Sequence, residues 1–140
     1  MTKKYKILAK YIKDMSSETP DIETYIFVRD YIGKYQFNID INSKPLKDKM
    51  VEINTILKFE DKQENKKKSY FEINYSSIVR IDEDIKEKKD LEKIILVKVP
   101  TEIYPELEKS FLNLLHNSGY PHVKFEKKVN FEQLYNQKFN

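Results

Sequence analysis

The chain contains no cysteine, no tryptophan and only two glycines among its 140 residues. Without cysteine it forms no disulfide and offers no thiol nucleophile or thiolate metal site, so it does not require an oxidising compartment. Two glycines are too few for a glycine-rich phosphate-binding loop. No apolar run approaches the roughly 20 residues that span a bilayer, and residues 1–6 do not lead into a signal-peptide core. We therefore expect a cytoplasmic protein without membrane insertion.

Reactive side chains are also scarce. The two histidines, His116 and His122, are six positions apart, and no serine or cysteine near them forms a nucleophile motif. This spacing differs from the i, i+4 pair of a helical zinc site. Because an enzyme needs convergent reactive groups, we assign no catalytic residue, no metal and no cofactor, and we predict that the protein is not an enzyme.

Aromatic residues are abundant instead, with ten tyrosines and eight phenylalanines. Tyrosine at a binding surface presents an apolar ring with a polar tip, so the excess suggests interfaces. The chain is also rich in lysine, asparagine and isoleucine, and an AT-rich genome would explain this composition, including the aromatic excess, equally well. The 26 basic and 23 acidic residues are interspersed and give a formal charge of +3, which is weak support for nucleic-acid binding.

The first half of the sequence predicts four strands, at residues 6–17, 35–41, 51–59 and 69–81. Apolar residues in the second strand alternate with polar ones, as a strand with one buried face requires. The charged run 61–68 predicts a hairpin loop, and the short spacings favour a four-stranded antiparallel meander. Residues 22–32 are left open between a helical turn and a crossover segment.

The second half predicts helices. Asp90 is suited to cap a helix that starts at Leu91 and is interrupted at Pro100. Pro105 suits the first turn of a second helix, which Gly119 would end in the left-handed conformation. Asn130 is suited to cap a short last helix. Strands followed by helices define the α+β class, with residues 1–140 as a single domain.

Two short segments resemble signatures of the SecB family of protein-export chaperones. The first is Lys13-Asp14-Met15-Ser16-Ser17-Glu18-Thr19-Pro20; the second is Gly119-Tyr120-Pro121 followed by Val129-Asn130-Phe131-Glu132. The order of strands and helices agrees with this family across nearly the whole chain. The resemblance implies an α+β fold in which a four-stranded antiparallel sheet carries a long helix and a short C-terminal helix on one face. It also implies a homotetramer, built as a dimer of dimers.

The resemblance further implies two binding sites. Unfolded preproteins would bind in an apolar groove, at positions that match Tyr35, Phe37, Ile39, Leu134 and Tyr135. The motor SecA would bind the exposed face of the sheet, at positions that match Asp14, Glu18, Tyr70 and Glu72. The implied function is a holdase that delivers preproteins to SecA for export. Two alternatives stay open: a SecB-like chaperone dedicated to one client, such as an antitoxin, and a nucleic-acid-binding module that uses lysines and sheet aromatics.

Overall fold

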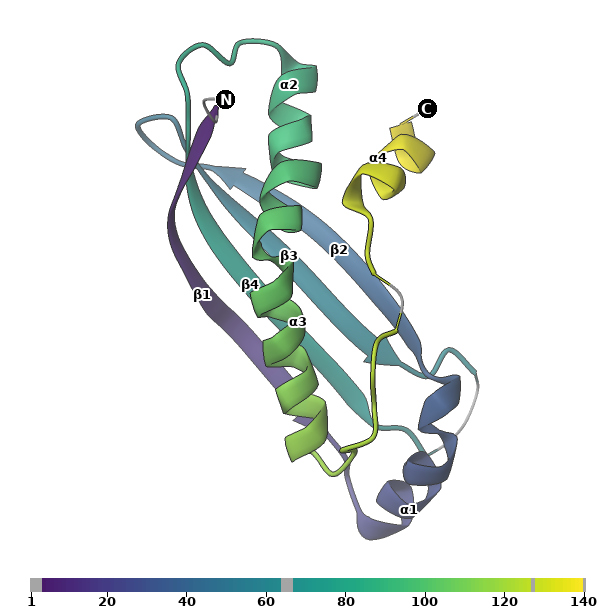
Figure 1. Ribbon diagram of the computed structural model, residues 1–140. Helices are drawn as coiled ribbons and strands as arrows, with labels where there is room; N and C mark the ends of the chain where they lie inside the picture. The colour runs from purple at the N-terminus through teal and green to yellow at the C-terminus, as the bar shows by residue number, and fades with distance from the viewer. Residues whose placement is uncertain (1–3, 64–66, 127, 140) are drawn as a thin grey trace.

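The computed structural model describes residues 4–63, 67–126 and 128–139, which form one sheet with helices on one of its faces (Figure 1). In chain order the elements are β1 (Tyr5–Glu18), α1 (Ile22–Tyr31), a 3₁₀ turn (Ile32–Lys34), β2 (Gln36–Pro45), β3 (Met50–Glu60), β4 (Tyr70–Ile81), α2 (Lys88–Lys93), a π-helical segment (Ile94–Lys98), α3 (Val99–Asn117) and α4 (Phe131–Phe139). The predicted class, α+β with a four-stranded antiparallel sheet, a long helix and a short C-terminal helix, is confirmed.

The sheet is antiparallel with strand order β1-β4-β3-β2, so the predicted four-strand meander is wrong for β1. Strands β2, β3 and β4 do form a meander, whereas β1 pairs with β4 at the opposite edge from β2. Residues 22–32 were left open between a helical turn and a crossover segment, and both alternatives apply. Helix α1 is part of the connection that crosses from β1 to β2. Asp21 caps it by accepting a hydrogen bond from the Thr24 amide at 2.8 Å. A connection of this length carries the chain between the two sheet edges, which a hairpin turn cannot do.

Alternation along the strands divides side chains between two faces. The inner face, toward the helices, carries Val51, Ile53, Leu57 and Phe59 of β3 and Phe71, Ile73 and Val79 of β4, all buried. The outer face carries the intervening, mainly polar residues. In β1 the register shifts between Ile7 and Ala9 and again between Ile12 and Asp14. These bulges reverse the alternation, so Ile7 and Ala9, two positions apart, pair with Val79 and Ile78 on opposite faces.

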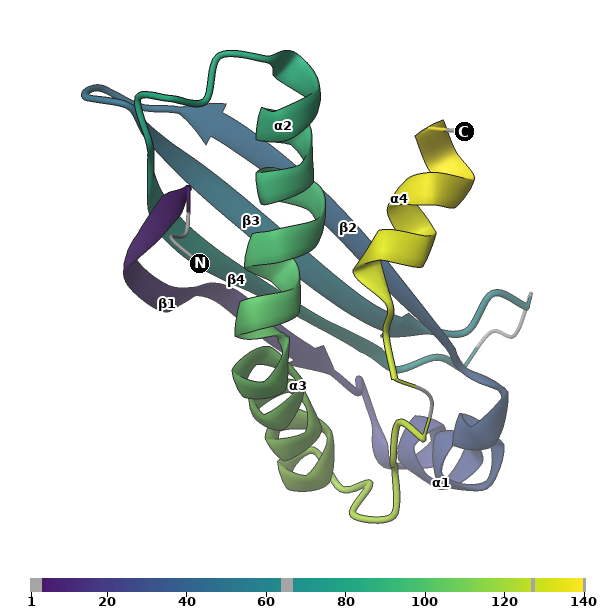
Figure 2. The ribbon, with the colours of Figure 1, turned by 45° about the horizontal axis from the view of Figure 1, so that its top comes forward.

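The helical half is one continuous run from α2 through the π segment into α3 (Figure 2). The predicted break at Pro100 does not occur, and Pro105 lies inside α3 rather than in a first turn. The run begins after Glu87, so Asp90 is in its first turn and is not its cap. A π turn just before Pro100 widens the helix, and the Thr101 hydroxyl donates to the Val97 carbonyl at 2.6 Å. Burial of the apolar face of α3 then offsets the cost of the prolines.

The short helix α4 lies on the same side of the sheet as α3 and contacts the π segment (Figure 1 and Figure 2). Its predicted cap is confirmed, because the Asn130 side chain accepts a hydrogen bond from the Gln133 amide at 2.9 Å. Residues 121–126, which we call the strap, come after α3 and cross the inner face without regular structure. The strap and α3 are thus the two long segments that enclose a cavity above the sheet.

Candidate functional site

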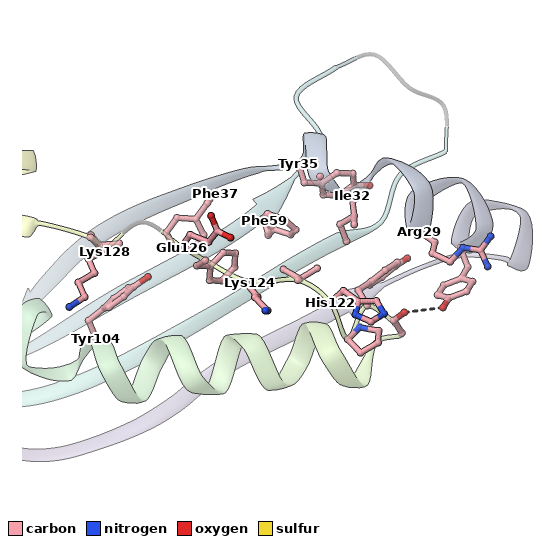
Figure 3. A pocket seen from close by; sticks show the side chains of 18 residues that line it. Arg29, Ile32, Tyr35, Phe37, Phe59, Tyr104, His122, Lys124, Glu126 and Lys128 are labelled. Atoms are coloured by element: carbon pink, nitrogen blue, oxygen red, sulfur yellow. Dashed lines mark hydrogen bonds between the residues drawn. The ribbon is translucent and has the colours of Figure 1, made fainter.

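A partly open cavity of about 960 Å³ lies above β2 and β3, between α3, the strap and the end of α1 (Figure 3). We call it the groove. Seven aromatic side chains line it: Tyr25, Tyr35, Phe37, Phe59, Tyr104, Tyr120 and Phe125. Pockets of this size lined by aromatic groups with a few polar ones are typical of binding sites for organic ligands and peptide side chains. The groove is therefore the candidate functional site.

The centre of the groove is built from phenylalanine rings of four different segments. Phe125 of the strap lies against Phe37 of β2 with ring centroids 4.8 Å apart, and against Phe111 of α3 at 6.0 Å. It also meets Phe59 of β3 edge-on at 5.6 Å. Each aromatic pair of this geometry contributes about 0.5–1.5 kcal/mol beyond simple burial. These rings hold the strap to the sheet and to α3.

One end of the groove is fixed by hydrogen bonds that converge on Ser69, a buried residue just before β4. Its amide donates to the Tyr35 hydroxyl at 2.9 Å, and its hydroxyl lies 3.2 Å from that of Tyr120. The Thr19 hydroxyl lies 2.7 Å from the same serine oxygen. Burial raises the pKa of Tyr35 above its ordinary value, so this hydroxyl stays protonated at neutral pH. The network fixes two tyrosine walls of the groove relative to each other.

Gly119 sets the direction in which the chain leaves α3 toward the groove. Its φ of 105° confirms the left-handed conformation predicted from its position, which side chains rarely adopt. A Cβ here would lie 2.6 Å from Cε1 of Tyr25. The Tyr25 hydroxyl donates to the Gly119 carbonyl at 2.9 Å. Only glycine therefore allows the tyrosine ring to pack on this backbone.

Tyr104 of α3 supplies a polar group within the largely apolar wall. Its side chain rises from the helix toward the groove (Figure 3), and its ring packs edge-on against Phe131 at 5.6 Å. The hydroxyl is buried and lies near the Glu108 carboxylate. Burial, followed by the negative charge of Glu108, raises its pKa. The hydroxyl is consequently a neutral hydrogen-bond donor at any physiological pH.

The predicted groove residues divide into two sets. Tyr35 and Phe37 line the groove. Ile39, Leu134 and Tyr135 do not: Ile39 packs against the core on the same face of β2, Leu134 is 45% exposed, and the Tyr135 hydroxyl donates to Glu92 at 3.2 Å. The prediction missed the strap and α3 contributions, above all Phe125 and Tyr104. The alternation Val123-Lys124-Phe125-Glu126 was the signal available for the strap.

The four predicted SecA positions lie together on the outer face. Strand pairing sets Glu18 opposite Tyr70 and Ser16 opposite Glu72, with Asp14 two residues farther along β1. The Tyr70 hydroxyl donates to Glu72 at 2.8 Å. Burial, then this hydrogen bond and the carboxylates of Glu72, Glu60 and Glu18, raise the pKa of Tyr70 to about 12.

The sequence prediction missed two charged residues that neighbour Asp14, Glu18 and Glu72 on the outer face. Lys58 of β3 lies 3.5 Å from Glu72, and Glu60 ends the same strand. The alternation with buried Leu57 and Phe59 places both on the outer face, so the signal was present in the sequence. The outer face is thus a mixed surface in which an ion pair offsets one of the acidic groups.

Among the described residues, no group of three or more histidine, aspartate or glutamate side chains could hold a metal ion. No helix in the described ranges is both long and apolar enough to cross a membrane.

An open aromatic groove on a sheet-and-helix scaffold is suited to binding organic groups, including the apolar side chains of a polypeptide. Comparison with known families makes this class specific. The family described as preprotein translocase subunit SecB matches residues 1–140, so the chain belongs to the SecB family. This is a family of chaperones in protein export and not of enzymes.

Individual relatives agree with the family. The chain is 61% identical to a Pelagibacter ubique protein that is provisionally named a protein-export protein SecB, over the full length of both chains. It is 24% identical to the protein-export protein SecB of Mesorhizobium japonicum, over 94% of this chain and 77% of the relative. Its fold is similar to that of a SecB-like chaperone from Mycobacterium tuberculosis, solved in complex with a ChAD peptide from an antitoxin. That similarity has a TM-score of 0.58 at 11% identity and covers 91% of this chain and 92% of the other.

Proposed function

We propose that residues 1–140 form one chaperone domain that holds unfolded preproteins in the groove, in the cytoplasm, and delivers them to SecA for export. The observation that supports this proposal is the aromatic lining of a partly open groove of about 960 Å³. Rings from α1, β2, β3, α3 and the strap contribute to the lining. We expect such a composite apolar surface to bind clients without selecting a particular amino-acid sequence. The provisional export name of the relative at 61% identity supports the same proposal.

Such a groove recognises an unfolded chain through apolar burial alone. At roughly 25 cal/mol per Å², each ~100 Å² of apolar client surface that is buried contributes about 2.5 kcal/mol before the costs of ordering and desolvation. Those costs cancel most of the gain, and the net affinity is moderate. A folded client hides the same surface, so binding ends when the client folds or is taken over by another protein. No nucleotide is needed for this cycle.

The decisive experiment mixes the purified protein, without ATP, with a chemically denatured precursor and follows aggregation by light scattering. We expect suppression at stoichiometric amounts and for several unrelated precursors. Suppression for one client alone would support a dedicated chaperone, and no suppression for any precursor would overturn the proposal. Binding to RNA or DNA with a steep salt dependence would favour the nucleic-acid alternative.

Delivery to SecA is proposed to use the outer face. Asp14 and Glu18 are exposed, and the pairing with β4 places them beside Tyr70 and Glu72. Combined replacement of Asp14, Glu18 and Glu72 by alanine is expected to weaken SecA binding at least tenfold, measured by calorimetry, while client binding is retained. The matched control replaces Lys6, Lys44 and Arg80 of the same face by alanine. Unchanged SecA affinity after the acidic replacement would contradict this part of the proposal.

A homotetramer is proposed for the assembled state. The edge strand β1 exposes Leu8, Tyr11, Ile12 and Met15 at 39–46% of their surface, and edge strands with exposed apolar side chains tend to pair with other chains. Light scattering coupled to size-exclusion chromatography is expected to give four times the 16.9 kDa chain mass. A monomer at micromolar concentration would refute it.

A further inference from the structure

We propose that Phe125 is a resident occupant of the groove, which an aromatic side chain of an unfolded client displaces on binding. This inference rests on the proposed function and adds a regulatory step to it. Phe125 fills the space among Phe37, Phe59 and Phe111, with centroid distances of 4.8, 5.6 and 6.0 Å. An aromatic side chain from an extended polypeptide would find the same three partners there. The strap therefore has the chemistry expected of a bound client segment.

The attachment of the strap differs from that of the rest of the groove. Phe37 and Phe59 belong to paired strands and lie opposite each other in the sheet. In the described part of the chain, by contrast, the backbone groups of residues 124–126 make no hydrogen bond. Lys124 and Glu126, on either side of Phe125, are already exposed to solvent. Withdrawal of residues 124–126 would thus break the ring contacts of Phe125 but no ladder of backbone hydrogen bonds.

The strap is nevertheless tethered at its start, so a displaced Phe125 stays near the groove. The Val123 amide donates to the Tyr120 carbonyl at 3.3 Å, and the Val123 carbonyl lies 3.0 Å from Nε2 of His116. A tethered competitor acts at a high effective concentration. It covers the aromatic floor in the empty protein and returns when the client leaves, so it lowers the affinity for every client without abolishing binding.

The test compares client affinities of full-length variants by fluorescence anisotropy with a labelled, unfolded precursor peptide that contains phenylalanine. Phe125→Ser removes the competitor and is expected to bind the peptide about tenfold more tightly than the wild type. A tenfold change corresponds to about 1.4 kcal/mol, the size of one or two aromatic pair contacts. Phe27→Ser, the same replacement at an exposed position of α1 that does not line the groove, is the matched control and should leave the affinity unchanged.

Weaker binding by Phe125→Ser would overturn the inference, because Phe125 would then be a residue that contacts the client. Equal binding would overturn it too, because Phe125 would then not compete with the client. If the wild type binds no unfolded peptide at all, the proposed function fails instead, so the two failures are distinguishable. A measurement on the wild type covers the case in which the variant does not fold. Nuclear Overhauser contacts between the rings of Phe125 and Phe111 should disappear when the groove is saturated with client, and their persistence would contradict displacement.

Discussion

The two faces of the sheet are made from the same strands but have opposite properties. Along β2 and β3 one residue points to the groove and the next points to the outer surface, so Phe37 and Phe59 lie on one side and Lys58 and Glu60 on the other. The inner face is covered by α3 and the strap, whereas no described helix covers the outer one. Because side chains alternate along strands that pair without bulges, as β2 and β3 do, a single strand serves two surfaces that can be altered separately.

The largest expected effect is on the end of the groove. Gly119→Ala places a methyl group against the Tyr25 ring and forces a positive φ on alanine. These two penalties together should lower the free energy of unfolding by about 2–4 kcal/mol, measured by urea denaturation. Gly33→Ala is the matched control, since nothing lies within 4 Å of its Cβ position, and it should change stability little. Equal effects of the two changes would show that the Tyr25 contact does not define this end of the groove.

The comparison of the faces is tested most directly on β2. Phe37→Ser removes a ring from the groove floor and should weaken client binding at least tenfold, or about 1.4 kcal/mol. Gln36→Ser, on the adjacent exposed position of the outer face, should leave client binding unchanged. Anisotropy titration of both variants decides the matter, provided that chromatography shows the same oligomer for each. A loss of affinity in the Gln36 variant would break the separation of the two faces.

A smaller effect is expected at Ser69. Ser69→Ala removes the hydroxyl that faces both Thr19 and Tyr120, which should cost about 1 kcal/mol of unfolding free energy. The Tyr35 contact survives, because it uses the Ser69 backbone amide. Ser43→Ala, at an exposed position of β2, provides the control. If urea denaturation gives the same unfolding free energy for the two alanine variants, the hydrogen bonds of the Ser69 hydroxyl do not stabilise the groove.

The smallest expected effect is on the pKa of Tyr70 at the outer face. Glu72→Gln removes the carboxylate that accepts its hydrogen bond, so the pKa should fall from about 12 toward 10, with burial preventing a full return. The folded wild type holds this proton more tightly than the unfolded chain, so the contribution of Tyr70 to stability is fully present below pH 10 and is lost as the pH rises toward 12. Tyrosinate absorbance, with Tyr70→Phe as the reference, reports the pKa. An unchanged pKa in the Glu72→Gln variant would show that the Glu72 carboxylate does not contribute to the raised pKa of Tyr70.

Much of this arrangement was predictable from the sequence, and the failures have physical causes. The strand alternation of β2, β3 and β4 and the left-handed Gly119 follow from local rules. The position of β1 does not, because a crossover pairs it with β4, and its two bulges depend on the partner strand. The helix runs through Pro100 because a π turn and tertiary burial outweigh the local preference of proline to end a helix.

The site was less predictable than the fold. Tyr35 and Phe37 stand out in the regular alternation of residues 35–41, whereas Phe125 is in a segment without secondary structure, where periodicity gives little information. Tyr104 lies on the buried face of α3 and could not be distinguished from an ordinary core residue. The acidic outer face was inferred from a motif resemblance. Alternation within β3 places Lys58 on this face, but its pairing with Glu72 follows only from the register of β3 and β4.

The convergence on Ser69 also has a consequence for the order of folding. Thr19, Tyr35 and Tyr120 reach this residue from sequence separations of 50, 34 and 51 residues. Contacts this distant form late, since they require the chain to close large loops. We therefore expect this end of the groove to be completed only after the apolar segments of the chain itself are buried.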